Sequence, residues 1–282
     1  MSKILVFQQL PEKHWNRLIS AAAGFQVIGG GNASDLPVHL QEAEILLGWR
    51  PEAAEVCLRS ETKLKWVQAW GAGVDKLPLD AMQRFGIIVT TTSGVHPNPV
   101  SETAFAMMLN FSRGVHLSIR NQMHRRWQAI DGLGEIHGKT IGIIGVGSIG
   151  KEIARLAKAF GMRVLGVRRS GGEAEHVDRM FSLDRLEEVL ESSDFVVSTL
   201  PLTSDTRYLF GRREFQKMKR TAFFVNVGRG ATVRTEDLIE ALRCGEIAGA
   251  GLDVFEQEPL PSESPLWEMD NVIITPHNGG VT

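Results

Sequence analysis

Three closely spaced glycines, lying between a strand pattern and a helix pattern, constrain the fold of this chain more than any other feature. Residues 140–144 are apolar and mostly β-branched, and the glycines Gly145, Gly147 and Gly150 follow directly. From Ile149 onward, apolar residues recur at helical spacing. Gly145 permits a tight turn, Gly147 lets the backbone approach a pyrophosphate, and Gly150 lets the helix pack on the strand. This strand, turn and helix predict a dinucleotide-binding unit.

Ser148 and Ile149 stand between the second and third glycines, where the helix begins. The first N–H groups of a helix have no partner within it, and the helix dipole adds a partial positive charge there. We therefore expect Ser148 and Ile149 to bind the cofactor together with the three glycines. A glycine turn without a ligand is the alternative, and the flanking elements argue against it.

The following strand bears on the choice of cofactor. Proteins that prefer NAD usually place an acidic residue about 20 residues after the turn, where it binds the ribose 2′-hydroxyl. Here the strand expected at 163–168 ends in Arg168, Arg169 and Ser170, with no acid before Glu173. Guanidinium groups bind phosphate oxygens well, so the sequence predicts that NADP(H) is preferred and NAD(H) possible. For either arginine alone, a solvated surface charge is an equal interpretation.

Short apolar runs alternate with helical patterns along the chain, which is typical of α/β folds with parallel sheets. A first series predicts strands at 3–7, 25–28, 44–47, 65–69 and 87–91 and helices at 11–22, 51–59 and 78–84. A second series predicts strands at 140–145, 163–168, 194–200, 222–227, 248–253 and 271–275 and helices at 148–160, 183–192, 212–219 and 235–243. Between them, 99–128 reads as one long helix or a broken pair. We therefore expect two α/β domains, residues 1–96 and 97–282, the second with a Rossmann-type doubly wound parallel sheet.

Charge and cysteine content exclude several classes of protein. The 31 basic and 33 acidic residues give a net charge of −2, which argues against a general nucleic-acid or anionic-membrane binder. The N-terminal apolar run is too short for a signal peptide or a membrane span. Cys57 and Cys244 are too few for a disulfide framework and lack metal-ligand spacing, so we expect a cytoplasmic protein without a metal.

Polar residues follow three of the later strands, at the edge where open α/β sheets bind ligands. Arg229 stands between two glycines after one strand, and Asp253 ends the next and precedes Glu258 by five residues. His277 follows the last strand. Each of these residues taken alone has a structural interpretation, as an ion pair, a strand end or a surface histidine. Their occurrence together, after a phosphate-binding turn in the chain, favours a catalytic role over these structural ones.

These segments resemble the D-isomer-specific 2-hydroxyacid dehydrogenase family, in particular its phosphoglycerate-dehydrogenase-like and glyoxylate/hydroxypyruvate-reductase-like members. The resemblance covers nearly the whole chain, with four motifs in the same order. It implies an NAD(P)-dependent oxidoreductase that reduces a small 2-keto acid to the D-2-hydroxy acid, with a smaller flavodoxin-like substrate domain beside the Rossmann domain. It also implies that Arg229 binds the substrate, that Glu258 pairs with His277, and that Asp253 faces the nicotinamide.

The chemistry of the reaction agrees with these residue types. The reaction delivers hydride to the carbonyl carbon of the keto acid and a proton to its oxygen. A histidine titrates near neutral pH and can supply that proton. A carboxylate beside it favours the charged imidazole and fixes the ring. A guanidinium holds the substrate carboxylate and stabilises the developing oxyanion. The expected catalytic set is Arg229, Glu258 and His277.

The resemblance implies further binding residues and a partner. Main-chain N–H groups of Ala72 and Gly73 would bind the substrate carboxylate, although an ordinary turn is an equal interpretation of the residues alone. Further cofactor contacts are expected from loops after two of the strands: Leu200, Pro201, Thr206 and Val227. Family members use the long helical segment in dimer contact, so a homodimer is expected. Trp127, with Arg113, Arg125 and Arg126 on that segment, would then reach a partner, or else form a solvated basic face.

The pattern departs from the family at its end. Family members continue through a helix that returns to the substrate domain, whereas this sequence stops five residues after His277, so we expect the substrate domain to lack that helix. Short-chain dehydrogenases are excluded because the single tyrosine, Tyr208, is followed four residues later by Arg212 rather than lysine. Glu258 argues against formate dehydrogenases, which carry glutamine there. A dinucleotide-sensing binding protein on the same scaffold is the alternative function.

Overall fold

A computed structural model describes residues 1–29 and 36–281. The chain divides into two compact units, Met1–Val95 and His96–Thr282, and each is described by itself.

The first unit contains a five-stranded parallel sheet in the order β2-β1-β3-β4-β5. Its strands are β1 (Ser2–Val6), β2 (Phe25–Gly29), β3 (Ala43–Leu47), β4 (Trp66–Gln68) and β5 (Ile88–Thr90). Its helices are α1 (Glu12–Ala21), α2 (Leu36–Glu42), α3 (Glu52–Cys57) and α4 (Leu79–Arg84). This is the flavodoxin-like strand order, so the fold class expected for the smaller domain is confirmed.

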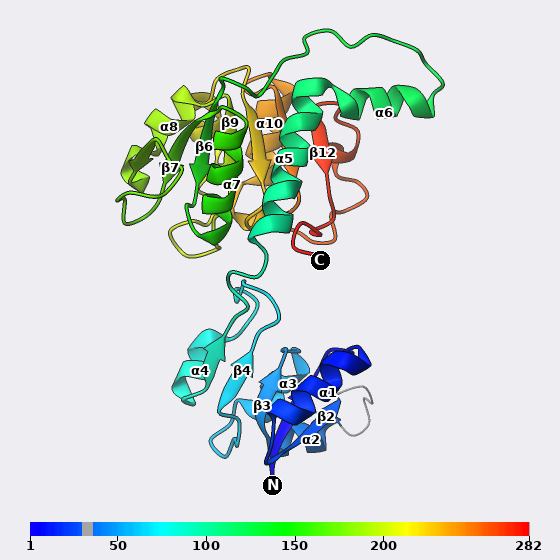
Figure 1. The fold of residues 1–282 in the computed structure, drawn as a ribbon, viewed down its shortest axis with the longest axis vertical. Helices are drawn as coiled ribbons and strands as arrows, with labels where there is room; N and C mark the ends of the chain where they lie inside the picture. The colour runs from blue at the N-terminus through cyan, green and yellow to red at the C-terminus, as the bar shows by residue number, and fades with distance from the viewer. Residues whose placement is uncertain (30–35, 282) are drawn as a thin grey trace. The chain divides into compact units, whose positions relative to one another are not determined.

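The second unit contains a seven-stranded parallel sheet in the order β12-β11-β10-β9-β6-β7-β8 (Figure 1). Its strands are β6 (Thr140–Ile144), β7 (Arg163–Val167), β8 (Arg179–Phe181), β9 (Phe195–Ser198), β10 (Phe223–Asn226), β11 (Gly249–Leu252) and β12 (Val272–Ile274). Its α-helices are α5 (Pro97–Arg113), α6 (Val115–Met123), α7 (Ser148–Ala159), α8 (Leu186–Ser192), α9 (Arg212–Lys217) and α10 (Thr235–Arg243). Short 3₁₀ turns lie at Leu183–Arg185, Gly230–Thr232 and Pro265–Trp267. The order runs outward from β6 in both directions, so the predicted Rossmann-type sheet is confirmed.

Helices cover both faces of this sheet, and strand side chains alternate between them. Ile141 and Ile143 of β6 belong to the buried cluster beneath α5 and α7. Ile144 belongs to the cluster beneath α8, α9 and α10. Burial on both faces explains why these strands read as continuous apolar runs rather than as an alternating pattern.

Two elements were missed from the sequence because each has too few buried residues to produce a pattern. Helix α2 buries only Leu36 and Leu40 among its described residues, and the three-residue strand β8 buries only Phe181. Strand β8 pairs with β7 and extends the sheet at that edge.

The segment expected as one long helix or a broken pair at 99–128 is a broken pair that ends earlier than predicted. Helix α5 ends at Arg113, because the next residue, Gly114, has a φ of 60°, and a Cβ on Gly114 would lie 2.8 Å from the Ile130 and Leu133 side chains. Helix α6 ends at Met123, because Arg125 takes the left-handed conformation and the N–H of Arg126 bonds the carbonyl of Asn121. Arg125, Arg126 and Trp127 therefore follow the helix instead of lying on it.

Among the described residues, no helix is both long and apolar enough to cross a membrane.

Candidate active site

The glycine turn connects β6 to α7 as the sequence predicts, and steric limits explain its glycines. Gly145 has a φ of 106°, and the Thr199 hydroxyl donates to its carbonyl. A Cβ on Gly150 would overlap that same carbonyl oxygen, so helix and turn can pack only without a side chain there. At Gly147, in contrast, no described heavy atom lies within 4 Å of the position a Cβ would take. The backbone is therefore open to a ligand at Gly147 and closed by packing at the other two glycines.

This geometry fits a dinucleotide pyrophosphate. Helix α7 begins at Ser148, and no described side chain caps its N-terminus. The leading N–H groups of the helix, at Ser148, Ile149 and Gly150, therefore have no intrahelical acceptor. The open backbone of Gly147 beside these donors leaves room for an anionic group to approach them.

The residues predicted to choose the cofactor lie directly after β7, the neighbour of β6 in the sheet. Arg168 donates from Nε and Nη2 to the carbonyl of Gly171, at 3.0 and 2.7 Å. Its guanidinium thus shapes the loop in which Arg169 and Ser170 are exposed. The first acid after the strand, Glu173, also lies in this loop.

The loop after β9 lies on the other side of β6, between the glycine turn and the loop that carries Arg229. A Cβ on Gly145 would lie 3.3 Å from the Leu200 amide, and one on Gly228 would lie 2.6 Å from the Leu200 carbonyl oxygen. The Thr206 hydroxyl donates to the Pro201 carbonyl at 2.7 Å, which closes this loop on itself. Val227 is buried at the end of β10. Of the residues predicted here to contact a cofactor, Thr206 has its side chain directed into its own loop.

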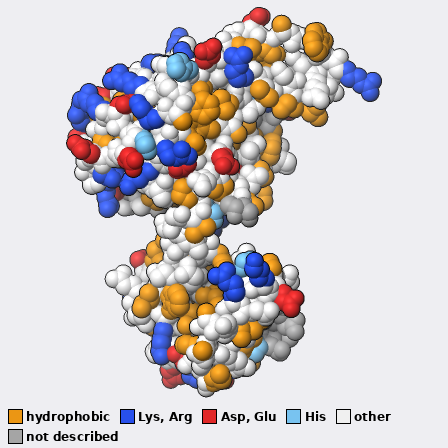
Figure 2. Space-filling view, viewed as in Figure 1, with side chains coloured by type: hydrophobic (Ala, Val, Ile, Leu, Met, Phe, Trp, Pro, Cys, Tyr) orange, Lys and Arg blue, Asp and Glu red, His pale blue; other side chains and the backbone are white. Residues whose placement is uncertain are grey.

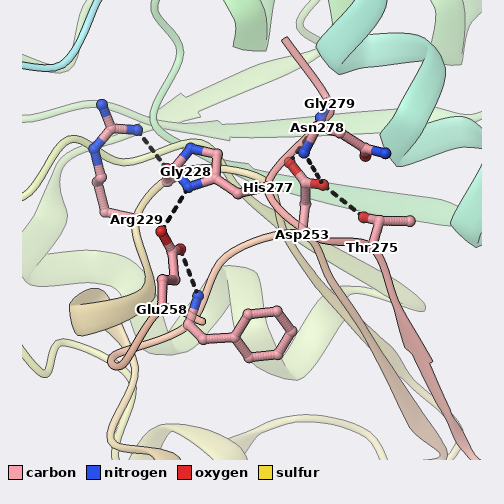
Figure 3. A network of polar contacts seen from close by, with 9 residues as sticks. Gly228, Arg229, Asp253, Glu258, Thr275, His277, Asn278 and Gly279 are labelled. Atoms are coloured by element: carbon pink, nitrogen blue, oxygen red, sulfur yellow. Dashed lines mark hydrogen bonds and ion pairs between the residues drawn. The ribbon is translucent and has the colours of Figure 1, made fainter. Parts of the chain in front are cut away.

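His277 and Glu258 meet in a hydrogen bond, as Figure 3 shows. The His277 Nδ1 lies 2.8 Å from the Glu258 Oε2, and Glu258 Oε1 accepts from the Phe255 N–H at 3.1 Å. The carboxylate therefore fixes the ring through Nδ1 and leaves Nε2 as the nitrogen that can face a substrate. His277 has a φ of 51°, a conformation that a non-glycine residue adopts only when its surroundings impose it.

The buried carboxylate of Asp253 holds the turn on which His277 stands. Its Oδ1 accepts from the Thr275 hydroxyl at 2.6 Å and from the Asn278 N–H at 3.1 Å, and its Oδ2 accepts from the Gly279 N–H at 3.0 Å (Figure 3). The Asp253 carbonyl also accepts from the His277 N–H at 2.8 Å. Asp253 is 3% exposed, and all three of its acceptor atoms are used in fixing this turn.

Asn226 holds the loop of Arg229 in a similar way. Its side chain accepts from the Gly228 N–H and donates to the Arg229 carbonyl, both at 3.1 Å. The Thr232 hydroxyl donates to the same carbonyl at 2.6 Å. The Asn226 carbonyl accepts from the Asp253 N–H at 3.0 Å, so the two loops are linked across neighbouring strands. The Arg229 Nη1 donates to the Gly228 carbonyl at 2.8 Å.

Neither Asn226 nor Thr275 was predicted as a site residue. Asn226 ends β10 and Thr275 directly follows β12, two or three residues before the charged group, and a polar residue at the end of an apolar strand is the signal that could have identified each of them.

The expected catalytic residues therefore follow three neighbouring strands of one sheet. Arg229 follows β10, Glu258 follows β11 and His277 follows β12, at the same edge as the glycine turn after β6. Ala72 and Gly73 belong to the first unit, on the loop after β4, where the Thr92 hydroxyl donates to the Trp70 carbonyl at 2.8 Å.

Comparison with known proteins agrees with this arrangement. The model of the family described as D-isomer specific 2-hydroxyacid dehydrogenase, NAD binding domain, matches residues 105–279. A glyoxylate/hydroxypyruvate reductase B of Escherichia coli is 37% identical over an alignment of 290 positions, gaps included, that covers 99% of this chain and 88% of that protein.

Solved structures give the same result. A D-isomer specific 2-hydroxyacid dehydrogenase family protein from Aeromonas salmonicida superposes with a TM-score of 0.87 at 40% identity, covering 99% of this chain and 89% of that one. An NADPH-dependent glyoxylate/hydroxypyruvate reductase from Sinorhizobium meliloti, in complex with NADP and sulfate, has a TM-score of 0.84 at 30% identity, with 99% and 89% covered. The chain belongs to the D-isomer specific 2-hydroxyacid dehydrogenase family, and its second unit carries that family's NAD-binding domain.

Proposed function

We propose that this protein is an oxidoreductase that reduces a small 2-keto acid to the D-2-hydroxy acid with NAD(P)H. The hydrogen bond between His277 and Glu258, at the sheet edge that also carries the glycine turn, is the observation that carries the proposal. The relatives are named as reductases, which favours catalysis over a dinucleotide sensor on the same scaffold.

The residues of the chain have two tasks, proton transfer to the substrate and binding of its carboxylate. The bound nicotinamide supplies the hydride. His277 gives a proton from Nε2 to the carbonyl oxygen of the substrate, while Glu258 stabilises the charged ring and keeps it oriented. Arg229 binds the substrate carboxylate and stabilises negative charge on the carbonyl oxygen. Asp253 holds the turn of His277, and we expect it to act through that turn.

We propose NADPH as the preferred cofactor. Arg168, Arg169 and Ser170 after β7 offer donors to a 2′-phosphate, and the loop brings no carboxylate before Glu173. Replacing Arg169, the exposed arginine, by aspartate is expected to raise the KM for NADPH by about ten-fold, because one charge-assisted contact is lost and a repulsion is added. The KM for NADH should change little. A wild-type enzyme that prefers NADH would contradict this part of the proposal.

We propose a homodimer formed through α6. This helix extends away from the sheet in Figure 1, and Figure 2 shows hydrophobic side chains along it. Its exposed apolar side chains are Val115, Ile119 and Met123, and Trp127 follows it fully exposed. Contiguous apolar surface of this kind marks an interaction site. Light scattering should give twice the monomer mass for the wild type, and Ile119→Asp with Met123→Asp should give the monomer mass.

The cysteines support a cytoplasmic location. Cys57 and Cys244 are both free thiols, as expected in a reducing compartment. Burial raises the pKa of the Cys57 thiol to about 11, so this cysteine is an inert core residue.

Turnover of a keto-acid panel tests the central proposal. Oxidation of NADPH is followed with glyoxylate, hydroxypyruvate and pyruvate, and the products of hydroxypyruvate and pyruvate are assayed for the D-isomer. We expect turnover of at least one acid. Tight NADPH binding without turnover of any of them would contradict the proposed function and favour a sensor.

A further inference from the structure

An apolar cavity lies directly beside the His277–Glu258 pair, within the second unit. Its volume is about 390 Å³, which is within the range of small-molecule pockets. Besides the pair itself, the lining residues are Phe255, Pro259, Leu260, Trp267, Ile274 and Pro276. The imidazole and carboxylate therefore form one polar patch on an otherwise apolar wall.

The Glu258 carboxylate and the Trp267 indole N–H in this wall are bonded to other protein groups, whereas the His277 Nε2 is the nitrogen assigned to the substrate. Glu258 accepts from His277 through one oxygen and from the Phe255 N–H through the other. The Trp267 indole N–H donates to the Pro261 carbonyl at 2.9 Å. A polar ligand group that entered the cavity would lose hydrogen bonds to water and meet mainly apolar side chains, which is unfavourable. Burial of an apolar group there would be favourable, because it removes apolar surface from water.

Trp267 is held in place as a wall of this cavity. It ends the 3₁₀ turn Pro265–Trp267, which is anchored by the buried side chain of Leu266. With its indole N–H bonded to the backbone, the ring presents a fixed apolar face although the residue is 49% exposed. Rigid aromatic surface of this kind binds apolar groups at little cost in conformational entropy.

We propose that this cavity is the subsite for the substituent on the keto carbon and that Trp267 determines its specificity. The inference rests on the proposed function, because the cavity touches the groups assigned to proton transfer. It assigns a substrate class: 2-keto acids with an extended apolar chain at C3, rather than glyoxylate, whose keto carbon carries only hydrogen. A substrate without such a chain would leave this apolar wall in contact with water.

The test measures kcat/KM with NADPH for unbranched 2-keto acids from pyruvate to 2-ketohexanoate, with glyoxylate as the reference. We expect kcat/KM to rise about four-fold for each added methylene until the cavity is full. A flat or falling series, with glyoxylate turned over, would overturn the subsite and leave the proposed function standing. Absence of turnover with every acid would overturn both.

Variants separate a specificity role of Trp267 from a structural one. Trp267→Ala is expected to lower kcat/KM for 2-ketohexanoate by about ten-fold and to leave the value for glyoxylate within about two-fold. Trp267→Phe, which keeps an aromatic wall, should retain most of the preference. Leu79→Ala, which truncates an exposed leucine of the first unit, is the control and should change neither value. An equal loss for both acids with Trp267→Ala would overturn the assignment.

A filling variant supplies an independent readout. Leu260→Phe places a larger side chain in the lining and should shorten the preferred chain without loss of glyoxylate turnover. An unchanged chain-length profile in this variant, with an unchanged melting temperature, would also overturn the subsite.

Discussion

Two turns at the same edge of the second sheet are built in opposite ways. The turn after β6 depends on side chains that are absent, because a Cβ on Gly150 would overlap the Gly145 carbonyl. The turn after β12 depends on side chains that are present, because Asp253 accepts three hydrogen bonds from Thr275, Asn278 and Gly279. The first turn leaves backbone donors open to a ligand. The second holds the backbone of His277 in a left-handed conformation, which a non-glycine residue rarely adopts without support from its surroundings.

This difference predicts that the two turns fail in different ways when they are changed. An added methyl group in the glycine turn should affect cofactor binding or folding. Loss of an acceptor beneath the histidine turn should affect the rate of proton transfer, because the ring is displaced while the cofactor site is intact.

The largest effect is expected from Asp253→Ala. The Thr275 hydroxyl and two backbone N–H groups lose their acceptor, so the turn relaxes and His277 moves. A displacement of about 1 Å can cost on the order of 100-fold, so we expect kcat to fall by about that factor. Steady-state kinetics measures kcat, and fluorescence titration measures the Kd for NADPH, which should change by less than three-fold.

Thr275→Val is the matched smaller change at the same turn. It removes one of the donors to Asp253 and keeps the shape of the side chain, so a fall in kcat of about ten-fold is expected. Thr275→Ser, which restores the hydroxyl, should recover most of the activity. A loss of NADPH affinity without a loss of kcat in Asp253→Ala would contradict the role given to this carboxylate.

Gly147→Ala and Gly150→Ala form the next pair. A methyl group at Gly147 meets no described atom, so folding should be unaffected, whereas the Kd for NADPH should rise about ten-fold as the pyrophosphate is displaced from the helix N-terminus. A methyl group at Gly150 should lower the free energy of unfolding by about 1–3 kcal/mol. Urea unfolding and NADPH titration of both variants distinguish the two results. Unchanged NADPH affinity in a folded Gly147→Ala variant would contradict the assignment of this turn.

The smallest effect is expected at His116, outside both turns, and concerns the pH dependence of the free energy of unfolding. Burial lowers the pKa of His116, whose ring packs edge-on against Phe111. Folding therefore favours the neutral ring, and the free energy of unfolding should decrease as pH falls below about 6.5, the unfolded value. His116→Asn should remove this part of the dependence in urea unfolding measured between about pH 7.5 and 5.5. A wild-type profile that is identical to that of the variant would show that His116 does not contribute.

The same comparison explains how much of the site could be predicted from the sequence. The glycine turn is local: three glycines within six residues, between a strand and a helix, carry their own steric explanation. The histidine turn is not local, because Asp253 and the groups it binds are 22 to 26 residues apart in the chain. The resemblance to a family supplied the pairing of Glu258 with His277. The hydrogen bonds by which Asn226 and Thr275 hold the two loops became visible only in the structure.

The fold follows a similar division. Strands buried on both faces, such as β6, could be located from their apolar runs. Helix α2 and strand β8 could not, because each rests on one or two buried side chains and takes its conformation from neighbouring elements. The early end of α6 depends on a left-handed arginine, Arg125, a conformation that residue type does not predict.

The most direct test of this account is the turnover of His277→Ala with a 2-keto acid and NADPH, measured beside its affinity for NADPH. If His277 supplies the proton, kcat should fall by a factor of about 10² to 10⁴ while the Kd for NADPH stays within about two-fold of the wild type. Near-normal turnover by this variant would contradict the account, because another group would then have to deliver the proton.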